Sequence, residues 1–394
     1  MTKTVGILGA AKARQPFMIA LSLLILTFFY GCGGNSVRTF SIEEVDRFLN
    51  SDHGPIVFDR SDSRDTSRWE WVDSLDKNGM TLTWRSKPSR TILGSDSSSS
   101  AKWLHMRETM TYDSIPNVAE CYEGRLSINS RLKILYHLNF LRSLHNLDPL
   151  LYNCDDDLFA QRGALIMAAN NERGLNHFPD TSWHCWTPEG ANGTAQSCLA
   201  TEGFFDDEFM TAGVFITEWL IDLGSDPVGH RRWLLDPFAR TVAFGRIDLP
   251  KIYKNGTSAS FGALLIRDDD VLASPLKVQY VAYPFKDYPA ALFDKEWFAS
   301  FSVVADSVNY WNNNSVDFSH STIAISDENA DSVAVTSIEY DNQSYGLPNS
   351  LQWKMKALKV GRKYDVGIRN VQIDGVSHSY GYWFRLTKDH PIPY

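Results

Sequence analysis

The sequence predicts an α+β protein in which a helical stretch and its sheet are followed by a separate β-sandwich. Apolar residues recur at helical spacing between residues 127 and 223. Strand-like segments follow up to residue 283, and short alternating segments fill the chain from about 285 onward. The 394 residues, of which 43% are apolar and 22% charged, suit a folded chain of two or three domains.

The chain begins with a segment typical of export. Three basic residues precede the apolar run Phe17–Tyr30, whose 14 residues suit a signal peptide better than a membrane span. We therefore predict that residues 1–31 form a signal peptide. Because Gly31 and Cys32 follow directly, the leader resembles that of bacterial lipoproteins. This resemblance implies a lipid on Cys32 that anchors the protein to a membrane of the cell envelope, at the outer membrane or cell surface.

Two alternatives to the lipoprotein interpretation stay open. One is an ordinary secretory leader with an unmodified cysteine, and the other is a retained anchor helix. All three place the protein outside the cytoplasm.

The charge of the mature chain excludes two classes of partner. Loss of residues 1–31 removes three positive charges from a net charge of −9, which gives −12. Nucleic acids and anionic membrane surfaces are bound by basic faces. Neither is therefore expected as a partner.

Four cysteines remain in the mature chain: Cys121, Cys154, Cys185 and Cys198. An even number in an exported protein predicts two disulfides, for which three pairings are open. We prefer the short loop from Cys185 to Cys198, which leaves Cys121 with Cys154. A zinc site is the rival interpretation, although no Cys-x-x-Cys spacing supports it.

Residues 32–119 are predicted to form an N-terminal region of unknown role that is partly β. Alternating apolar residues on both sides of Asn78-Gly79 predict a β-hairpin, because this dipeptide favours a tight two-residue turn. The sequence of this region contains no catalytic motif.

Residues 120–284 are predicted to form a domain of helices and an antiparallel sheet. Leucines at three-residue intervals from Leu132 to Leu144 predict a first helix, and an Asp-Asp-Asp run favours the start of a second. A third helix carries Trp219 and is expected to end near Gly224. The predicted strands of this domain are 241–247, 258–266 and 278–283.

Residues 285–394 are predicted to form a small, immunoglobulin-like β-sandwich. Several short segments alternate between apolar and polar residues and are separated by Gly and Asn turns. The clearest of these strands carry Tyr364, Val366 and Ile368, and Tyr380, Tyr382, Phe384 and Leu386.

Five motifs between residues 125 and 284 resemble the CAP superfamily, which includes cysteine-rich secretory, antigen 5 and pathogenesis-related proteins, and its bacterial members look closest. The order and spacing of the motifs carry the resemblance more than any single one. The tail from Tyr288 is similar to the sandwich that often follows this domain in bacteria. The motifs are Asn139–Arg142, Asn146–Leu150, Leu175–His177, Trp183–Gly190 and Gly229–Pro237.

The resemblance implies an α-β-α sandwich with a cleft lined by two histidines and two acidic residues. His177 and His230 match the two family histidines. Asp222 stands three positions after the helix tryptophan, where the family usually has Glu. The stretch that should carry the other acid is here Ser-Cys-Leu-Ala at 197–200, so Glu189, or else Glu202, is expected to substitute for it.

The chemistry of such a cluster allows two uses. Two neutral imidazoles, here His177 and His230, could hold a divalent cation such as zinc with a carboxylate, or the groups could act as general acid and base. Taken alone, each histidine fits equally well a hydrogen bond to a loop. The remaining histidines of this stretch are assigned to packing or to the surface: His137, His145 and His184.

The expected function is that of an exported, lipid-anchored binding or interaction module rather than an enzyme. Its ligand would be a lipid, a cell-wall polymer or a host surface. One alternative is a metal-assisted hydrolase that uses the same cleft. Another is a structural envelope protein with a vestigial cleft. A cysteine nucleophile at Cys185 or Cys198 is disfavoured, since bridged cysteines are commoner in exported proteins.

Overall fold

The computed structural model describes residues 111–204, 209–223, 227–250 and 257–388 in full, apart from the side chain of Phe204. Of the preceding chain it describes the backbone of 39–40, 69–76 and 79–86. The predicted signal peptide and Cys32 lie outside the described residues.

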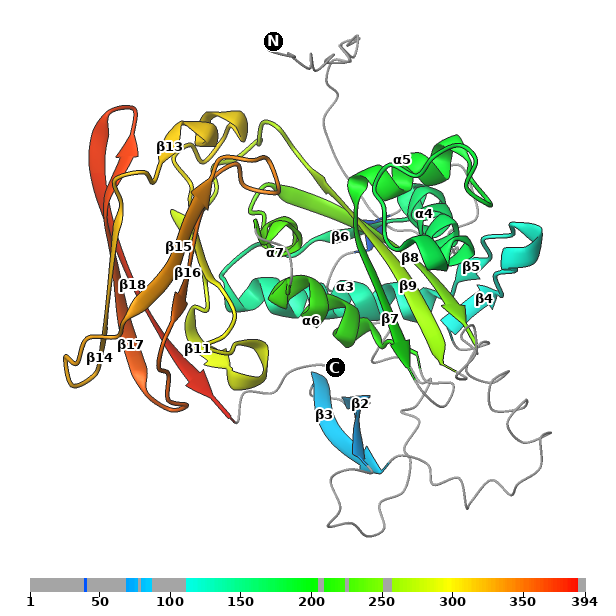
Figure 1. The fold of residues 1–394 in the computed structure, drawn as a ribbon, viewed down its shortest axis with the longest axis horizontal. Helices are drawn as coiled ribbons and strands as arrows, with labels where there is room; N and C mark the ends of the chain where they lie inside the picture. Colours follow the sequence, from blue (N-terminus) through cyan, green and yellow to red (C-terminus); the bar gives the residue numbers. More distant parts are fainter. Residues whose placement is uncertain are drawn as a thin grey trace, which may run out of the picture. The chain divides into compact units, whose positions relative to one another are not determined.

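One five-stranded sheet organises the first domain (Figure 1), in the order β1-β6-β8-β9-β7. β8 and β9 form a long antiparallel pair, β7 runs antiparallel to β9, and β6 runs parallel to β8. The strands are β1 (Thr39–Phe40), β6 (Leu151–Asn153), β7 (Ser197–Phe204), β8 (Ala239–Leu249) and β9 (Ser258–Asp268).

Helices cover both faces of this sheet. α4 and α5 pack together over β8 and β9, whereas α3 and α6 pack together on the opposite face. This is the three-layer arrangement that the α-β-α prediction describes. The helices are α3 (Ile128–Leu144), α4 (Asp157–Ala169), α5 (Pro188–Gln196), α6 (Ala212–Ile221) and α7 (Gly229–Leu234).

Side-chain volume determines which helix lies on which face. Under α6, Phe215 stacks on Trp219 at 5.5 Å between ring centroids and meets Phe244 of β8 edge-on at 5.3 Å. The next residue of β8, Gly245, faces α4, and a Cβ there would lie 2.1 Å from the carbonyl oxygen of Ala160. Only glycine therefore allows α4 to approach the sheet this closely.

The predicted β-sandwich is present and consists of two sheets. One has the order β10-β12-β16-β15, and the other has the order β11-β18-β17-β13 with β14 paired to β17. Its strands are β10 (Tyr280–Tyr283), β11 (Lys286–Pro289), β12 (Ala299–Val303), β13 (Val316–Asp317), β14 (Thr322–Asp327), β15 (Val335–Asp341), β16 (Ser350–Met355), β17 (Lys363–Ile373) and β18 (Val376–Thr387).

The assignment of residues 278–283 to the sheet of the first domain was wrong. This segment contains a strand, β10, but β10 pairs antiparallel with β12 of the sandwich. Val281, Ala282 and Tyr283 are all buried, so the strand suits either sheet and its sequence alone could not choose the partner.

The predicted N-terminal hairpin is confirmed: β2 (Trp69–Asp76) pairs antiparallel with β3 (Gly79–Ser86), and Asp76 lies opposite Gly79. A shorter pair joins β4 (Tyr112–Ser114) to β5 (Arg125–Leu126). The short 3-10 helices are η2 (Val118–Glu120), η3 (Cys154–Asp156), η4 (Asn171–Arg173), η5 (Ala290–Leu292) and η6 (Trp311–Ser315).

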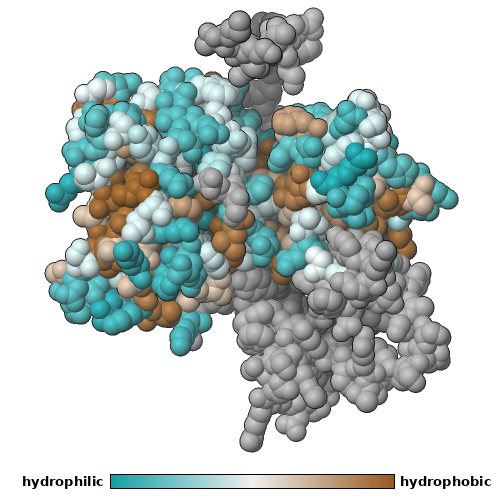
Figure 2. Space-filling view, viewed as in Figure 1, coloured by the Kyte–Doolittle hydropathy of each residue, from teal (hydrophilic) through white to brown (hydrophobic). Residues whose placement is uncertain are grey.

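Among the described residues, no helix is both long enough and apolar enough to cross a membrane. On the face drawn in Figure 2, hydrophilic side chains cover much of the described surface, with hydrophobic patches between them.

Candidate functional site

The side chain and backbone of His230 are both held by Asp222. The Nδ1 atom of His230 lies 2.8 Å from Oδ1 of Asp222, and the backbone N–H of His230 donates to Oδ2 at 2.9 Å. Because a carboxylate only accepts, Nδ1 carries the proton of the neutral ring and Nε2 keeps its lone pair. Histidines that bind a ligand or metal are commonly oriented in this way.

The position of Asp222 results from how α6 ends. The helix was expected to continue to Gly224, but it ends at Ile221, and Asp222 is its C-cap with a left-handed φ of 56°. Asp tolerates this conformation better than most residues. Val228, just before α7, has a φ of 44°, which is unusual for a β-branched residue. Backbone strain of this kind gathers at functional sites.

The two arginines that follow His230 attach α7 to α6 and to the sandwich. Arg231 is buried and donates to the carbonyl oxygens of Leu220 and Ile221 on one side and of Phe298 on the other. Arg232 pairs with Asp341 at 2.7 Å. The helix that carries His230 is thus held between α6 and the sandwich.

His177 is fixed by a different element. Its Nδ1 lies 2.8 Å from the backbone oxygen of Thr194, near the end of α5, and the Thr194 hydroxyl donates back to the oxygen of His177 at 3.1 Å. A carbonyl oxygen also only accepts, so His177 has the same tautomer as His230 and likewise presents Nε2.

The junction between α5 and β7 contains one residue that contacts His177 and one that carries a buried thiol. Thr194 holds His177 at one end of this junction. At the other end, burial and, secondarily, the charge of Asp222 raise the pKa of the Cys198 thiol well above its usual value. We call His177, Thr194, Cys198, Asp222 and His230 the histidine site.

The predicted second acid, Glu189, is not part of this set. Thr187 caps α5 through its hydroxyl, which places Glu189 in the first turn, and Glu189 pairs with Arg162 of α4 at 3.1 Å. Glu202 shares the face of β7 that carries Cys198, since alternate residues of a strand point the same way. Glu202 contributes, after burial, to the raised pKa of Glu218 on α6.

The predicted disulfide pairing was wrong. Cys121 is bonded to Cys185, and Cys198 is a buried free thiol. The predicted pair of Cys121 with Cys154 is therefore wrong as well, because Cys121 is bonded to Cys185. Cys185 and Cys198 stand at opposite ends of α5, whose nine residues span about 14 Å. That span exceeds the 7 Å or so between Cα atoms that a disulfide allows.

Cys198 is the residue whose role sequence reasoning missed. It lies in the stretch 197–200, where the resemblance led us to expect a carboxylate, and the structure places a buried thiol there. The absence of the expected acid from the family motif was a signal that this stretch differs. We did not use that signal, because we assumed that every cysteine of the mature chain forms a disulfide.

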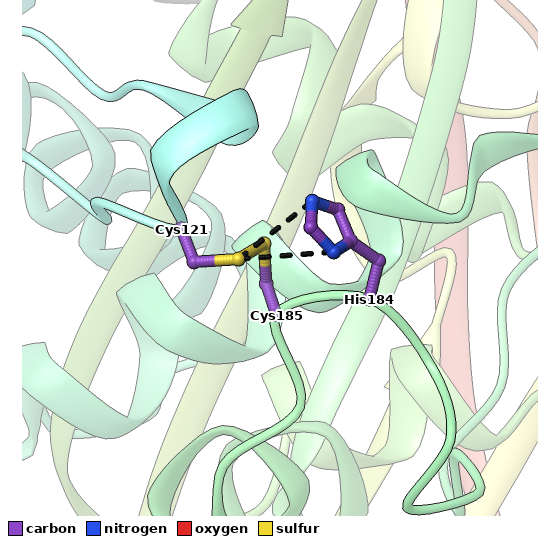
Figure 3. A group of neighbouring side chains, drawn as sticks. All are labelled: Cys121, His184 and Cys185. Carbon is purple, nitrogen blue, oxygen red and sulfur yellow. Dashed lines mark hydrogen bonds between the residues drawn. A yellow bond between two sulfur atoms is a disulfide. The ribbon is translucent and has the colours of Figure 1, made fainter.

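The histidine site does not supply three metal ligands. Among the described residues, the group of three His, Cys, Asp or Glu side chains with donor atoms near enough to share an ion is Cys121, His184 and Cys185 (Figure 3). His177 and His230 each present Nε2, but Asp222 is engaged with His230 itself and Glu189 with Arg162. The residues present therefore do not fit the cation that the family resemblance suggested.

One described cavity includes no residue of the histidine site in its lining. It has a volume of about 230 Å³ and is lined by residues that include Tyr112, Phe209 and Arg246. Of the other histidines, His145 is buried between Ala282 and Tyr288, as a packing residue should be, whereas His184 is exposed.

A three-layer α-β-α domain with two fixed histidines, followed by a β-sandwich, defines the class of protein. Residues 135–257 match the model of the cysteine-rich secretory protein family, CAP. The chain therefore contains a CAP domain and is a CAP-domain protein. Comparison with curated proteins and with solved structures finds no match.

Proposed function

We propose that this CAP-domain protein is exported, anchored through a lipid on Cys32, and acts as a binding or interaction module through its histidine site. The basic and apolar leader and the cysteine that follows it support export and anchoring. The histidine site supports binding, for the reasons that follow.

The observation that carries the proposal is the fixed orientation of the two histidines. Thr194 accepts a hydrogen bond from Nδ1 of His177, and Asp222 accepts one from Nδ1 of His230. Each ring is thus held by its own partner, with Nδ1 occupied and Nε2 presented as an acceptor. Orientation by fixed neighbours is what a binding surface needs, because little freedom is lost when the ligand arrives.

The occupied carboxylates favour binding over hydrolysis. Asp222 is engaged with His230, and Glu189 is engaged with Arg162. A metal-assisted hydrolase needs about three protein ligands and an open position. The histidine site offers two imidazoles, so the hydrolase is the weaker candidate.

Exposed apolar side chains next to the site indicate an amphiphilic ligand. Phe178, beside His177, is 80% exposed, and Leu223, beside Asp222, is 67% exposed. Leu175 is exposed to 41% on the same loop as Phe178. Two acceptor atoms on a negatively charged protein favour a headgroup that donates hydrogen bonds, such as an ammonium or hydroxyl group. We therefore propose that the ligand combines such a headgroup with acyl chains.

Binding to vesicles of two compositions tests this proposal. The Cys32→Ser protein, which lacks the lipid, is mixed with phosphatidylcholine vesicles that either contain or lack phosphatidylethanolamine. The phosphatidylethanolamine headgroup has N–H donors, whereas the choline headgroup has none. We expect stronger binding to the vesicles with phosphatidylethanolamine, and at least about tenfold weaker binding for Phe178→Ser and for His177→Ala with His230→Ala.

Matched controls lie on the sandwich. Val376 is 58% exposed there, and His320 is an exposed histidine, so Val376→Ser and His320→Ala should bind as the unsubstituted protein does. Equal binding to both kinds of vesicle, or a loss as large in the controls, would refute the proposal. Release of Zn²⁺ from the protein on His177→Ala would instead favour the hydrolase.

A further inference from the structure

We propose that Cys121, His184 and Cys185 form a redox-gated site for a thiophilic divalent cation such as Zn²⁺. The site is closed while the two cysteines form their disulfide and opens when a dithiol reduces it. This proposal is independent of the histidine site and of its ligand.

The donor atoms are already near the geometry of a metal site. The Sγ and ring-nitrogen atoms of the three side chains all lie within 4.8 Å of one another. In Figure 3 the imidazole of His184 faces the disulfide, with Nε2 3.7 Å and Nδ1 4.0 Å from Sγ of Cys121. Tetrahedral Zn²⁺ with ordinary bond lengths needs sulfur and nitrogen about 3.6 Å apart, and two sulfurs about 3.8 Å apart.

Only the sulfur atoms must separate for the cation to enter. The Cα atoms of Cys121 and Cys185 are 5.0 Å apart, so side-chain rotation alone can move the sulfurs from a bonded pair to ligand positions. A disulfide sulfur is not a thiolate, and thiolate is the form that binds zinc. Reduction is therefore what creates the ligand set.

The loop that carries His184 and Cys185 is held without the disulfide. The side chain of Asn170, which is buried, accepts from the backbone N–H of His184 and donates to its carbonyl oxygen, both at 3.0 Å. The neighbouring Trp183 is buried, and it packs with Trp186 in the core cluster under α4. This loop should therefore keep its place when the disulfide opens.

The turn that carries Cys121 is also held without the disulfide. The side chain of Asn117 accepts from the N–H groups of Ala119 and Glu120, and its backbone exchanges two hydrogen bonds with Tyr122. Because the ligand atoms on both sides are already in place, little conformational entropy is lost when the cation binds.

The disulfide is open to a reductant. The group lies at the surface, and His184 is exposed.

The chemical steps balance as follows. The reductant is a dithiol, either a small molecule or the cysteine pair of an oxidoreductase. It donates two electrons and two protons to the disulfide and becomes a disulfide itself, which leaves two thiols on this chain. The cation then binds both sulfurs and one nitrogen of His184, and two protons leave the thiols. The fourth position remains for water or another ligand.

Cobalt binding to the whole protein tests the site, because thiolate ligands give Co²⁺ an intense charge-transfer absorption. The oxidised protein should show none. After reduction with a phosphine and removal of the reductant, we expect the absorption at one equivalent of Co²⁺, and its loss on competition with Zn²⁺. His184→Ala should weaken Zn²⁺ binding at least about 100-fold, since even groups that support a ligand contribute 10- to 100-fold.

The control variants separate this site from the other cysteines. Cys198→Ser and His320→Ala should leave the absorption unchanged. Cys121→Ser with Cys185→Ser should abolish it, although Cys154 and Cys198 remain in the chain. His184→Ala keeps the disulfide and so reports on the site even if the double variant folds poorly. The proposal is overturned if reduced protein shows no thiolate absorption, or if the double variant or His184→Ala retains it in full.

Discussion

Asp222 contacts His230 twice, through Oδ1 to the ring Nδ1 at 2.8 Å and through Oδ2 to the backbone nitrogen at 2.9 Å. One carboxylate thus fixes both the tautomer of the ring and the first turn of α7. The contact is buried, because Asp222 is only 6% exposed.

We expect Asp222→Asn to lower the free energy of unfolding by about 1–3 kcal/mol, because an amide has one oxygen where two donors need an acceptor. Asparagine adopts the left-handed backbone of position 222 as readily as aspartate does, so the backbone adds little to the effect. Urea unfolding measures the change. The exposed Glu202→Gln is the control, and a variant as stable as that control would contradict the described contact.

Arg231→Lys should weaken the attachment of α7 to the sandwich. The guanidinium donates to three carbonyl oxygens and stacks on Tyr283 at 4.1 Å, which a lysine ammonium cannot reproduce. We expect a loss of about 3 kcal/mol in unfolding free energy. Arg125→Lys, at a surface ion pair, should change stability by less than about 0.5 kcal/mol. Equal effects of the two substitutions would be inconsistent with this role for Arg231.

The stability of the protein should depend on pH through Asp236. Burial raises the pKa of this carboxyl from 3.8 to about 7, so the native state keeps a proton that the unfolded chain has lost. Stability is therefore lost as pH rises from about 4 to 7, by up to about 1.4 kcal/mol per pH unit. Asp236→Asn keeps the acceptor for the N–H of Phe238 but cannot titrate.

The stability of the Asn variant relative to the parent protein should accordingly increase from pH 4 to pH 7 and then level off. Urea midpoints at several pH values measure this difference. Other buried carboxyls titrate in both proteins and cancel from it. Parallel pH profiles would show that Asp236 is already ionised in the folded state.

Removal of the Cys121–Cys185 disulfide should destabilise the protein. The bond closes a loop with a sequence separation of 64 residues, and Cys121→Ala with Cys185→Ala should lower the unfolding free energy by about 2–4 kcal/mol. Cys198→Ala, at a buried free thiol, should cost about 1 kcal/mol. If the double variant were as stable as the parent, the disulfide would not constrain the unfolded chain.

The sequence predicted most elements that repeat a local pattern. Leucine spacing indicated α3, Asn78-Gly79 indicated the β2–β3 hairpin, and alternation indicated the long strands of the sandwich. These signals arise within a few residues, so they can be recognised without knowledge of the tertiary structure.

Features that depend on distant partners were harder to predict. Cys198 cannot pair with Cys185 because α5 separates them, and the sequence does not show that separation directly. Strand β10 could likewise have paired in either sheet. The link between Asp222 and His230 depends on α6 ending at Ile221, two residues before Leu223 and three before the expected glycine. The family motifs mark the two histidines and Asp222 as candidate site residues, and this assignment stays a prediction.

Nitrogen NMR of the histidine rings tests the central claim most directly. With dihexanoyl phosphatidylethanolamine added to the Cys32→Ser protein, we expect the Nε2 signals of His177 and His230 to shift together, starting from rings protonated at Nδ1. The signal of His320 should stay in place. If the lipid binds while both site histidines keep their shifts, or if either ring starts with its proton on Nε2, the histidine site is not the binding surface described here.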